Sequence, residues 1–163
     1  MKIAICPGTF DPITNGHIDI IKRATSIFEK VIVAVAVNPS KDTLFSYKER
    51  VFMVKEAVKA IKGVSVEGFS GLVVDYARKK GAKVIIRGLR MISDFEYEFQ
   101  MALTNRNLVP EVETIFLMPH PEYSYVSSRL IKEATSLGAN LDKFLPPLVL
   151  GRLIKKLGEN LHK

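Results

Sequence analysis

A turn-rich segment near the N-terminus holds the side chain best suited to chemistry on a phosphate. Residues 7–17 read Pro-Gly-Thr-Phe-Asp-Pro-Ile-Thr-Asn-Gly-His, so the segment brings Gly16 and His17 to the predicted start of a helix. The N–H groups and the positive end of the helix dipole at such a position favour an anion and disfavour a protonated imidazole. A neutral His17 could therefore donate a ring N–H to a phosphoryl oxygen, or it could be a capping or surface residue. The segment has neither the Gly-Lys-Ser/Thr of a Walker loop nor the spacing of a dinucleotide-binding loop.

Three basic side chains stand at or just beyond the predicted carboxyl ends of strands. Lys41 follows a strand and a turn at Pro39, whereas Arg87 ends the apolar run 84–86 and Arg90 comes three residues later. An ammonium group acts as a point charge for phosphate, and guanidinium groups bind oxyanions through two parallel hydrogen bonds. We expect the two arginines at the ligand edge of a sheet, while Lys41 could also be an ordinary exposed lysine.

A pair of serines is predicted to begin a later helix. Leu130 stands where a capping box would need Glu or Gln, so Ser127 and Ser128 are not explained as caps alone, and their hydroxyls and the helix N–H groups could form a second anion site. Arg129 follows the pair, and its side chain could lie on the outer face of the helix or reach a phosphate. Glu98 lies on another predicted helix, where a carboxylate is usually solvated or paired with an arginine.

The pattern of apolar residues predicts the elements that must position these groups. Short β-branched runs at residues 2–6, 31–37, 64–68, 83–87 and 114–118 alternate with longer amphipathic segments, which is typical of parallel βαβ units. The run 31–37 is apolar throughout, as in a strand covered on both faces. We therefore expect an α/β fold, a doubly wound five-stranded parallel sheet with a helical C-terminal end after Pro146 and Pro147. Ligands of such sheets bind at the carboxyl ends of the strands.

Two helices carry sequences typical of capping boxes. Ser46 and Glu49 open one of them, and Ser93 and Glu96 are predicted to open a second that runs to about Asn107. The apolar residues on one face of this second helix are Phe95, Phe99, Ala102 and Leu103.

Composition narrows the class of protein. The length of 163 residues predicts a single domain, 1–163, and the net charge of +7 favours anionic ligands without selecting among RNA, anionic lipid and small phosphate compounds. Cys6 is the single cysteine, so we expect no intramolecular disulfide and no cysteine metal site, and we expect Cys6 in the core. The apolar runs are too short for a signal peptide or a membrane span, so we expect a soluble cytoplasmic protein.

The motifs resemble those of one enzyme family. Gly-Thr-Phe-Asp-Pro followed by Thr-Asn-Gly-His resembles the Thr/His-x-Gly-His motif of the α/β nucleotidyltransferases, and Thr14, where most of that superfamily carries histidine, resembles the bacterial phosphopantetheine adenylyltransferases. The likeness runs from Ile3 to about Leu145. Its further segments are Asn-Pro-Ser-Lys at 38–41, Ile-Arg-Gly-Leu-Arg at 86–90, Asp-Phe-Glu-Tyr-Glu at 94–98 and Tyr-Ser-Tyr-Val-Ser-Ser at 123–128.

The resemblance implies a fold, an activity and partners. The fold would be the Rossmann-like nucleotidyltransferase fold, and the reaction would join ATP and 4′-phosphopantetheine into dephospho-coenzyme A and release pyrophosphate. Mg²⁺ would enter with ATP, bound chiefly by phosphates and water rather than by protein ligands. The family also implies a homohexamer and feedback inhibition by coenzyme A, and we expect neither nucleic acid nor a membrane as a partner.

The resemblance also implies which residues form the site. Those matched to the phosphopantetheine site are Thr9, Lys41, Leu72, Val73 and Arg87. Those matched to the ATP site are Gly8, Thr9, Phe10, His17, Gly88, Leu89, Arg90, Glu98, Tyr123, Ser124, Tyr125, Val126, Ser127, Ser128 and Arg129. His17, Lys41 and Arg90 would act in catalysis, which needs only alignment of the substrates and stabilisation of charge because the acceptor phosphate is already a nucleophile.

Two alternatives lead to different expectations. Another enzyme of the superfamily, with nicotinamide mononucleotide or glycerol phosphate as acceptor, would share the loop and the serine pair but should differ around Lys41, Leu72 and Arg87. A basic RNA-binding module would explain the charge of +7, but its aromatic residues would be interleaved with basic ones, whereas most aromatics in this sequence sit at core spacing.

Overall fold

The structure is a computed structural model that describes residues 2–37 and 42–161. Five strands form one parallel sheet in the order β3-β2-β1-β4-β5. They are β1 (Ile3–Gly8), β2 (Lys30–Ala36), β3 (Val64–Phe69), β4 (Val84–Gly88) and β5 (Glu113–Leu117). The predicted fold is confirmed, and each strand begins and ends within two residues of its predicted position.

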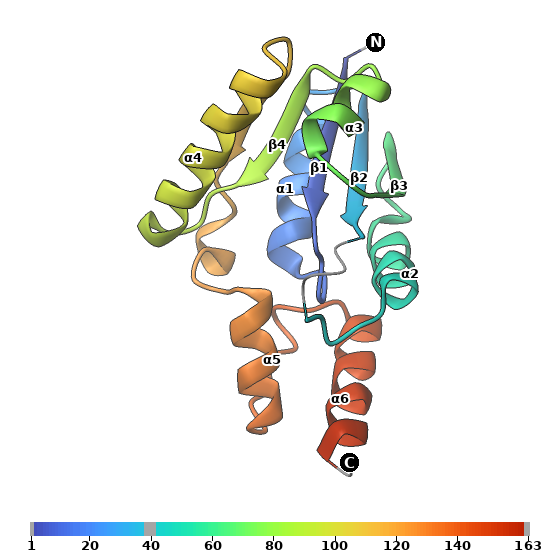
Figure 1. The fold of residues 1–163 in the computed structure, drawn as a ribbon. Helices are drawn as coiled ribbons and strands as arrows, with labels where there is room; N and C mark the ends of the chain where they lie inside the picture. The colour runs from blue at the N-terminus through green and yellow to red at the C-terminus, as the bar shows by residue number, and fades with distance from the viewer. Residues whose placement is uncertain (1, 38–41, 162–163) are drawn as a thin grey trace.

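Helices cover both faces of the sheet (Figure 1). They are α1 (Asn15–Thr25), α2 (Tyr47–Val58), α3 (Val73–Lys79), α4 (Ile92–Leu108), α5 (Ser128–Ser136) and α6 (Pro147–Leu161), with a short 3₁₀ helix, η1 (Pro121–Tyr123). In Figure 1, α3 lies in front of the sheet and α1 behind it, while α5 and α6 lie beyond the carboxyl ends of β1 and β2. Among the residues that the structure describes, no helix is both long and apolar enough to cross a membrane.

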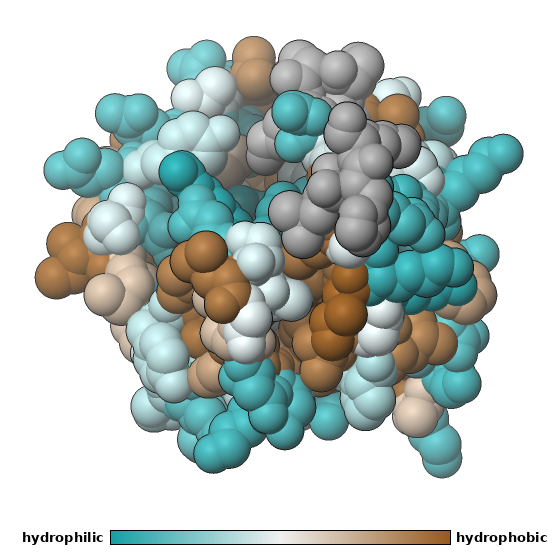
Figure 2. Space-filling model, turned by 90° about the horizontal axis from the view of Figure 1, so that it is seen from below, coloured by the Kyte–Doolittle hydropathy of each residue, from teal (hydrophilic) through white to brown (hydrophobic). Residues whose placement is uncertain are grey.

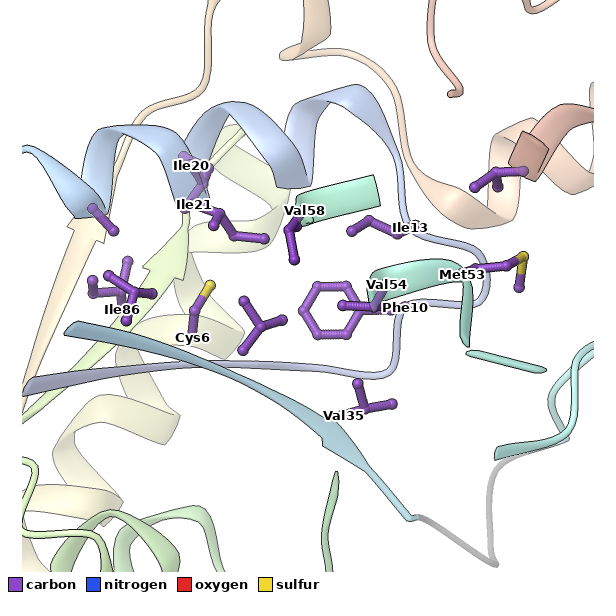
Figure 3. Packing of buried hydrophobic residues seen from close by; sticks show 14 of the residues in the cluster. Cys6, Phe10, Ile13, Ile20, Ile21, Val35, Met53, Val54, Val58 and Ile86 are labelled. Atoms are coloured by element: carbon purple, nitrogen blue, oxygen red, sulfur yellow. The ribbon is translucent and has the colours of Figure 1, made fainter. Parts of the chain in front are cut away.

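Two apolar clusters explain why the sheet is covered on both sides. Val31, Val33 and Val35 of β2 belong to a cluster that includes residues of α1, α2 and α6, whereas Ile32 and Ala34 belong to a second cluster with α3. Successive side chains of a strand point to opposite faces, so an apolar run such as β2 must be buried on both. Figure 3 shows the ring of Phe10 among the side chains of the first cluster.

Helix starts confirm one predicted capping box and correct the other. Ser46 Oγ accepts a hydrogen bond from Glu49 N–H, and the Glu49 carboxylate accepts one from Ser46 N–H, as predicted. The Ser93 box is wrong, because α4 begins at Ile92 with Met91 as its N-cap and Ser93 already lies in the first turn. The N–H of Asp94 donates to Met91 O and the Asp94 carboxylate pairs with Arg90, so the chain turns into the helix before Ser93.

Helix α4 presents its predicted apolar face away from the rest of the molecule. Phe95, Phe99 and Leu103 are each 45–48% exposed, and Ile92 is 90% exposed. The buried residues of α4 are instead the polar Glu98 and Asn105. We expected most aromatic residues at core positions, but Phe95 and Phe99 are not among those in the core.

Candidate active site

A cavity of about 570 Å³ opens at the carboxyl edge of the sheet, where β1 and β4 end and where α1, α4 and α5 begin. The predicted site residues that line it are Gly8, Thr9, Phe10, His17, Val73, Arg87, Gly88, Arg90, Glu98, Tyr123, Val126, Ser127, Ser128 and Arg129. Leu72, Leu89, Ser124 and Tyr125 lie outside this cavity. Lys41 lies outside the described residues, together with Asn38, Pro39 and Ser40. The edge of the sheet thus gathers most of the predicted site.

The ring of His17 is held by the residue that caps its helix. Thr14 Oγ1 accepts a hydrogen bond from His17 N–H at 3.3 Å, and Thr14 N–H donates to His17 Nδ1 at 3.1 Å. Because Nδ1 accepts this backbone N–H, we assign the ring proton to Nε2. The arrangement is a capping box in which a histidine takes the place that glutamate usually occupies.

His17 is neutral in this setting. Burial, and to a lesser extent the positive charges of Arg90 and Arg87, together lower its pKa to about 4. The sequence pointed to a neutral ring for a different reason, the dipole of α1. The structure shows that desolvation and two neighbouring guanidinium groups are the main physical causes. An uncharged imidazole with its proton on Nε2 can donate a hydrogen bond to a phosphoryl oxygen.

Phe10 and Gly8 shape the wall beside His17. Phe10 has a φ of +52°, a conformation that is uncommon for a bulky residue, and its buried ring packs edge-on against His17 with 5.2 Å between the ring centroids. A Cβ atom on Gly8 would lie 2.8 Å from Phe10 Cζ. Glycine at position 8 therefore leaves the space that the Phe10 ring occupies.

Arg87 and Glu98 form an ion pair at the site. Arg87 Nε and Nη2 donate to the two carboxylate oxygens of Glu98 at 2.8 and 2.5 Å, and Nη1 donates to Pro7 O at 2.8 Å. Burial alone would lower the pKa of Arg87, but the hydrogen bonds and the charge of Glu98 raise it. The resemblance matched Arg87 to the phosphopantetheine site and Glu98 to the ATP site. The structure pairs the two side chains, and pairing with an arginine was one of the environments that we considered for Glu98.

Arg90 joins two segments of the cavity wall. Its guanidinium pairs with Asp94 through Nε at 3.0 Å, and Nη1 donates to Val126 O at 2.9 Å. The second contact places Arg90 beside the residue that precedes the serine pair. A charge at Arg90 and the N-terminus of α5 therefore face the same part of the cavity.

The serine pair has structural partners as well as a place at the cavity. Ser127 is the N-cap of α5 and its Oγ accepts a hydrogen bond from Leu130 N–H at 3.0 Å, while Ser128 Oγ donates to Pro12 O at 2.8 Å. The side chain of Arg129 is 89% exposed and pairs with Glu133 one turn later. A contact of Arg129 with phosphate stays a prediction.

Cys6 lies in the core, as expected. It is 7% exposed, and burial raises the pKa of its thiol to about 11, although the charge of Arg87 acts in the opposite direction. A thiol with such a pKa stays protonated near neutral pH, which makes it a poor nucleophile.

Two buried charged residues beside the cavity were not among the predicted site residues. Asp11 pairs with Lys132, whose ammonium group lies 2.6 Å from Asp11 Oδ2, and both residues line the cavity. Arg50 of α2 is 2% exposed and donates to backbone carbonyls. A sequence signal existed for Arg50, because it precedes the buried Val54 by one helical turn and thus places a cation on an apolar stripe.

A second cavity of about 650 Å³ lies between the end of β3, the start of α3 and α4. Leu72 lines this second cavity, and Val73 lines both cavities. Leu72 is the N-cap of α3 and its side chain is exposed, so it is not the core residue that its apolar type would suggest. The two predicted apolar site residues therefore lie where a chain extending from the first cavity would meet them.

Comparison with known proteins matches the chain to one family. Residues 5–134 match the family model described as cytidylyltransferase-like. A phosphopantetheine adenylyltransferase of Heliobacterium modesticaldum is 53% identical over 162 residues, which cover 99% of this chain and 96% of that protein. Proteins of the same name from Alkaliphilus metalliredigens and Caldanaerobacter subterraneus are 55% and 56% identical over 96% of this chain and 99% and 98% of their own lengths.

Solved structures match the fold. A protein of Vibrio parahaemolyticus proposed to be a nicotinate-nucleotide adenylyltransferase superposes with a TM-score of 0.72 at 20% sequence identity, over 94% of this chain and 99% of that one. A bifunctional NMN adenylyltransferase/ADP ribose pyrophosphatase from Francisella tularensis gives a TM-score of 0.67 at 18% identity, over 94% of this chain and 49% of that one. At these identities the likeness establishes the nucleotidyltransferase fold and nothing about the acceptor.

Proposed function

The chain belongs to the phosphopantetheine adenylyltransferase family, and we propose that its cavity at the carboxyl edge of the sheet is where ATP and 4′-phosphopantetheine react to give dephospho-coenzyme A and pyrophosphate. The observation that carries this assignment is the state of His17. Its Nδ1 accepts from Thr14, its pKa is lowered to about 4, and its ring lines the cavity, so Nε2 can donate to a phosphoryl group at neutral pH.

The proposed reaction is a direct displacement. An oxygen of the acceptor phosphate forms a bond to the α-phosphorus of ATP, the bond from that phosphorus to the β-bridging oxygen breaks, and pyrophosphate leaves with the electron pair. The nucleophile is already an oxyanion, so the protein has to align the substrates and stabilise charge that develops on the α-phosphoryl oxygens. A neutral donor suits this task, because its hydrogen bond strengthens as the negative charge grows.

The roles that we propose for the cationic and hydroxyl groups rest on the family resemblance and, for the residues that the structure describes, on their positions at the cavity. We assign Thr9, Arg87 and Lys41 to the acceptor phosphate. We assign Arg90, Ser127 and Ser128 to the leaving pyrophosphate, which the bond from Arg90 to Val126 O supports, since it puts the guanidinium next to the serine pair.

The second cavity would take the pantetheine arm. Leu72 and Val73 offer it apolar contacts, and Val73 also borders the cavity that would hold the phosphate. This continuity supports an acceptor with a long, partly apolar chain over a compact acceptor such as glycerol phosphate.

Mg²⁺ would arrive with the phosphates of ATP. Within residues 2–37 and 42–161 no three His, Cys, Asp or Glu side chains gather into a group that could hold a metal ion. Such an ion commonly keeps several waters and binds through substrate phosphates, so MgATP would be the substrate.

The partners and location are part of the same proposal. The family resemblance implies six copies of the chain, and the exposed apolar residues of α4 supply a surface that a second copy could cover. It also implies inhibition by coenzyme A, whose pantetheine arm could occupy the second cavity. We place the protein in the cytoplasm, where ATP is supplied.

A pyrophosphate-release assay with ATP and a panel of phosphorylated acceptors tests the assignment. We expect fast release with 4′-phosphopantetheine and release at least 100-fold slower with nicotinamide mononucleotide or glycerol phosphate. Comparable turnover with nicotinamide mononucleotide would contradict the proposed acceptor.

A further inference from the structure

The guanidinium of Arg50 ties together three segments that border the cavity. Its Nη1 donates to Thr9 O at 2.6 Å and to Ala36 O at 3.0 Å, and its Nε donates to Phe45 O at 3.3 Å. The three acceptors belong to the loop after β1, to the last residue of β2 and to the segment that precedes α2. One side chain therefore fixes the relative positions of three separate stretches of backbone.

Asp11 holds the same segment from its other side. Its Oδ1 accepts from Phe45 N–H at 2.9 Å and its Oδ2 accepts from Leu44 N–H at 3.0 Å. The N–H of Phe45 is thus bound to Asp11 and its carbonyl to Arg50. Since Asp11 lies two residues after Thr9, the loop after β1 and the segment before α2 are joined twice.

The three tethered segments form part of the substrate cavities. Thr9 and Ala36 line the first cavity, as do Asp42 and Thr43 of the segment that leads to Phe45, and Ala36 also lines the second cavity. Arg50 itself is 2% exposed and is not among the residues that line either cavity. Its influence on a ligand would therefore pass through the backbone that it holds.

Stability of the fold alone is a weak explanation for a buried arginine at position 50. Taking a guanidinium out of water costs free energy that its hydrogen bonds only offset, and well-packed apolar residues often serve stability as well as a buried ion does. A buried cation bonded to three carbonyls does provide something that an apolar side chain cannot, which is directional contacts to backbone groups from distant parts of the chain.

We propose that Arg50 is a positioning residue for the acceptor phosphate, which sets the backbone of Thr9 and of the neighbouring cavity wall without touching the substrate. The inference rests on the proposed function. The resemblance also matched Thr9 to the ATP site, but the groups that we assign to pyrophosphate, Arg90 and the serine pair, have no hydrogen bond to Arg50. Loss of the tether should therefore harm the use of 4′-phosphopantetheine far more than the use of ATP.

Three variants test the inference by steady-state kinetics and by calorimetric titration with 4′-phosphopantetheine. Arg50→Met removes all donors with little change in length, Arg50→Lys keeps the charge and some of the hydrogen-bonding capacity, and Lys48→Met makes the same charge change at an exposed position of α2. We expect Arg50→Met to raise the KM and Kd for 4′-phosphopantetheine at least ten-fold, with the KM for ATP changed less than three-fold. Arg50→Lys should recover part of the loss, and Lys48→Met should match the parent.

The outcomes separate this inference from the function on which it rests. A parent enzyme that releases no pyrophosphate with 4′-phosphopantetheine would refute the proposed function. An active parent, together with an Arg50→Met protein that binds 4′-phosphopantetheine normally or loses both substrates equally, would show that Arg50 only stabilises the fold. If Arg50→Met does not fold, Arg50→Lys decides, because it should show the same selective loss at smaller size, and equal effects on both substrates would overturn the inference.

Discussion

The imidazole of His17 owes its chemistry to Thr14. Most of the superfamily that the sequence resembles carries histidine where this chain has Thr14, so this chain has no second imidazole at that position. In the structure Thr14 performs two tasks, since its hydroxyl caps α1 and its N–H donates to His17 Nδ1. The second contact fixes the tautomer, and it leaves Nε2 as the donor that the proposed reaction needs.

Replacing His17 should slow the chemical step more than it weakens binding. His17→Ala removes a donor whose interaction grows as charge develops in the transition state, so we expect kcat to fall about 100-fold or more. The KM values for both substrates should change less than five-fold. Steady-state kinetics with the folded variant would measure this, and an unchanged kcat would exclude His17 from the chemical step.

The lowered pKa of His17 should appear as a pH dependence of stability. The unfolded chain would bind a proton at His17 near pH 6.5, whereas the folded protein would do so only near pH 4. The contribution of the neutral ring to stability is therefore complete above pH 6.5 and is lost as the pH falls towards 4. Against His17→Gln, which cannot titrate, the parent should lose about 2 kcal/mol over this range, which is less than the full shift implies because the ring is partly exposed.

Denaturant unfolding of the parent and of His17→Gln at pH 7, 5.5 and 4 would measure this difference. The comparison cancels the carboxylates that titrate in both proteins. Parallel pH dependences would mean that His17 titrates near its ordinary pKa.

A methyl group on Gly8 should disturb the wall beside His17. In Gly8→Ala the new Cβ would lie 2.8 Å from the buried ring of Phe10, which already has a left-handed backbone and packs against His17. We expect a loss of stability of about 1–3 kcal/mol and a lower kcat. Gly151→Ala of α6 is the control, because open space surrounds that position and alanine favours a helix. If Gly8→Ala unfolds like the parent, the Phe10 ring must be free to move.

At the level of elements, the start of α5 has two tasks that one substitution can separate. Ser127 caps the helix and, in our proposal, faces pyrophosphate. Ser127→Ala should lose about 1 kcal/mol of stability with the cap, whereas Ser127→Asp should keep the cap, since aspartate caps as well as serine does.

The carboxylate of Ser127→Asp would repel the triphosphate, so the KM for ATP should rise at least ten-fold in a protein as stable as the parent. Thermal unfolding and ATP kinetics on the two variants check both parts. ATP kinetics equal to the parent in Ser127→Asp would place the triphosphate elsewhere.

The elements that the sequence predicted well are those whose patterns have a local cause. The apolar run that became β2 can be stable only in a strand covered on both faces, and the box at Ser46 is a contact between residues three apart. The start of α4 was predicted wrongly. The Asp94 carboxylate pairs with Arg90 and Asp94 N–H donates to Met91 O, so the helix begins before Ser93.

Contacts between segments that are far apart in the chain could not be predicted from the sequence. Arg87 and Glu98 could each be placed at the cavity, but their mutual pairing depends on how α4 crosses the end of β4. The bonds of Arg50 join residues up to 41 positions apart, and they become visible only when the loop after β1 and the end of β2 lie side by side. Local patterns thus predicted which residues gather at the carboxyl edge of the sheet, whereas the tertiary fold determines how their charges are paired.

At the level of the whole molecule, the net charge is +7, but the cations that line the first cavity within the described part of the chain are held in ion pairs. Arg87 pairs with Glu98, Arg90 with Asp94 and Lys132 with Asp11. A polyphosphate would have to share these cations with their carboxylates, so affinity for simple anions should be modest and ligand shape should decide binding. Figure 2, the view of the molecule from the end near α5 and α6, shows hydrophilic and apolar side chains interspersed over that face.

Assembly offers the last prediction, and it concerns the outer face of α4. A helix that buries Glu98 and Asn105 while it exposes Phe95, Phe99 and Leu103 has its apolar side turned outward, which is unfavourable in water unless another protein covers it.

If copies of this chain cover this face of α4, the parent should have a mass several times the 18.2 kDa of one chain in light scattering, about six-fold for a hexamer. Phe99→Asp should shift the protein towards one chain without unfolding it, because burying a carboxylate at the contact is costly whereas exposing it in the free chain is not. Ile154→Asp of α6 changes another exposed apolar residue, 56% exposed against 46% for Phe99, and should leave the mass unchanged. A parent that is monomeric, or a Phe99→Asp protein that assembles as the parent does, would mean that this face of α4 is not the contact.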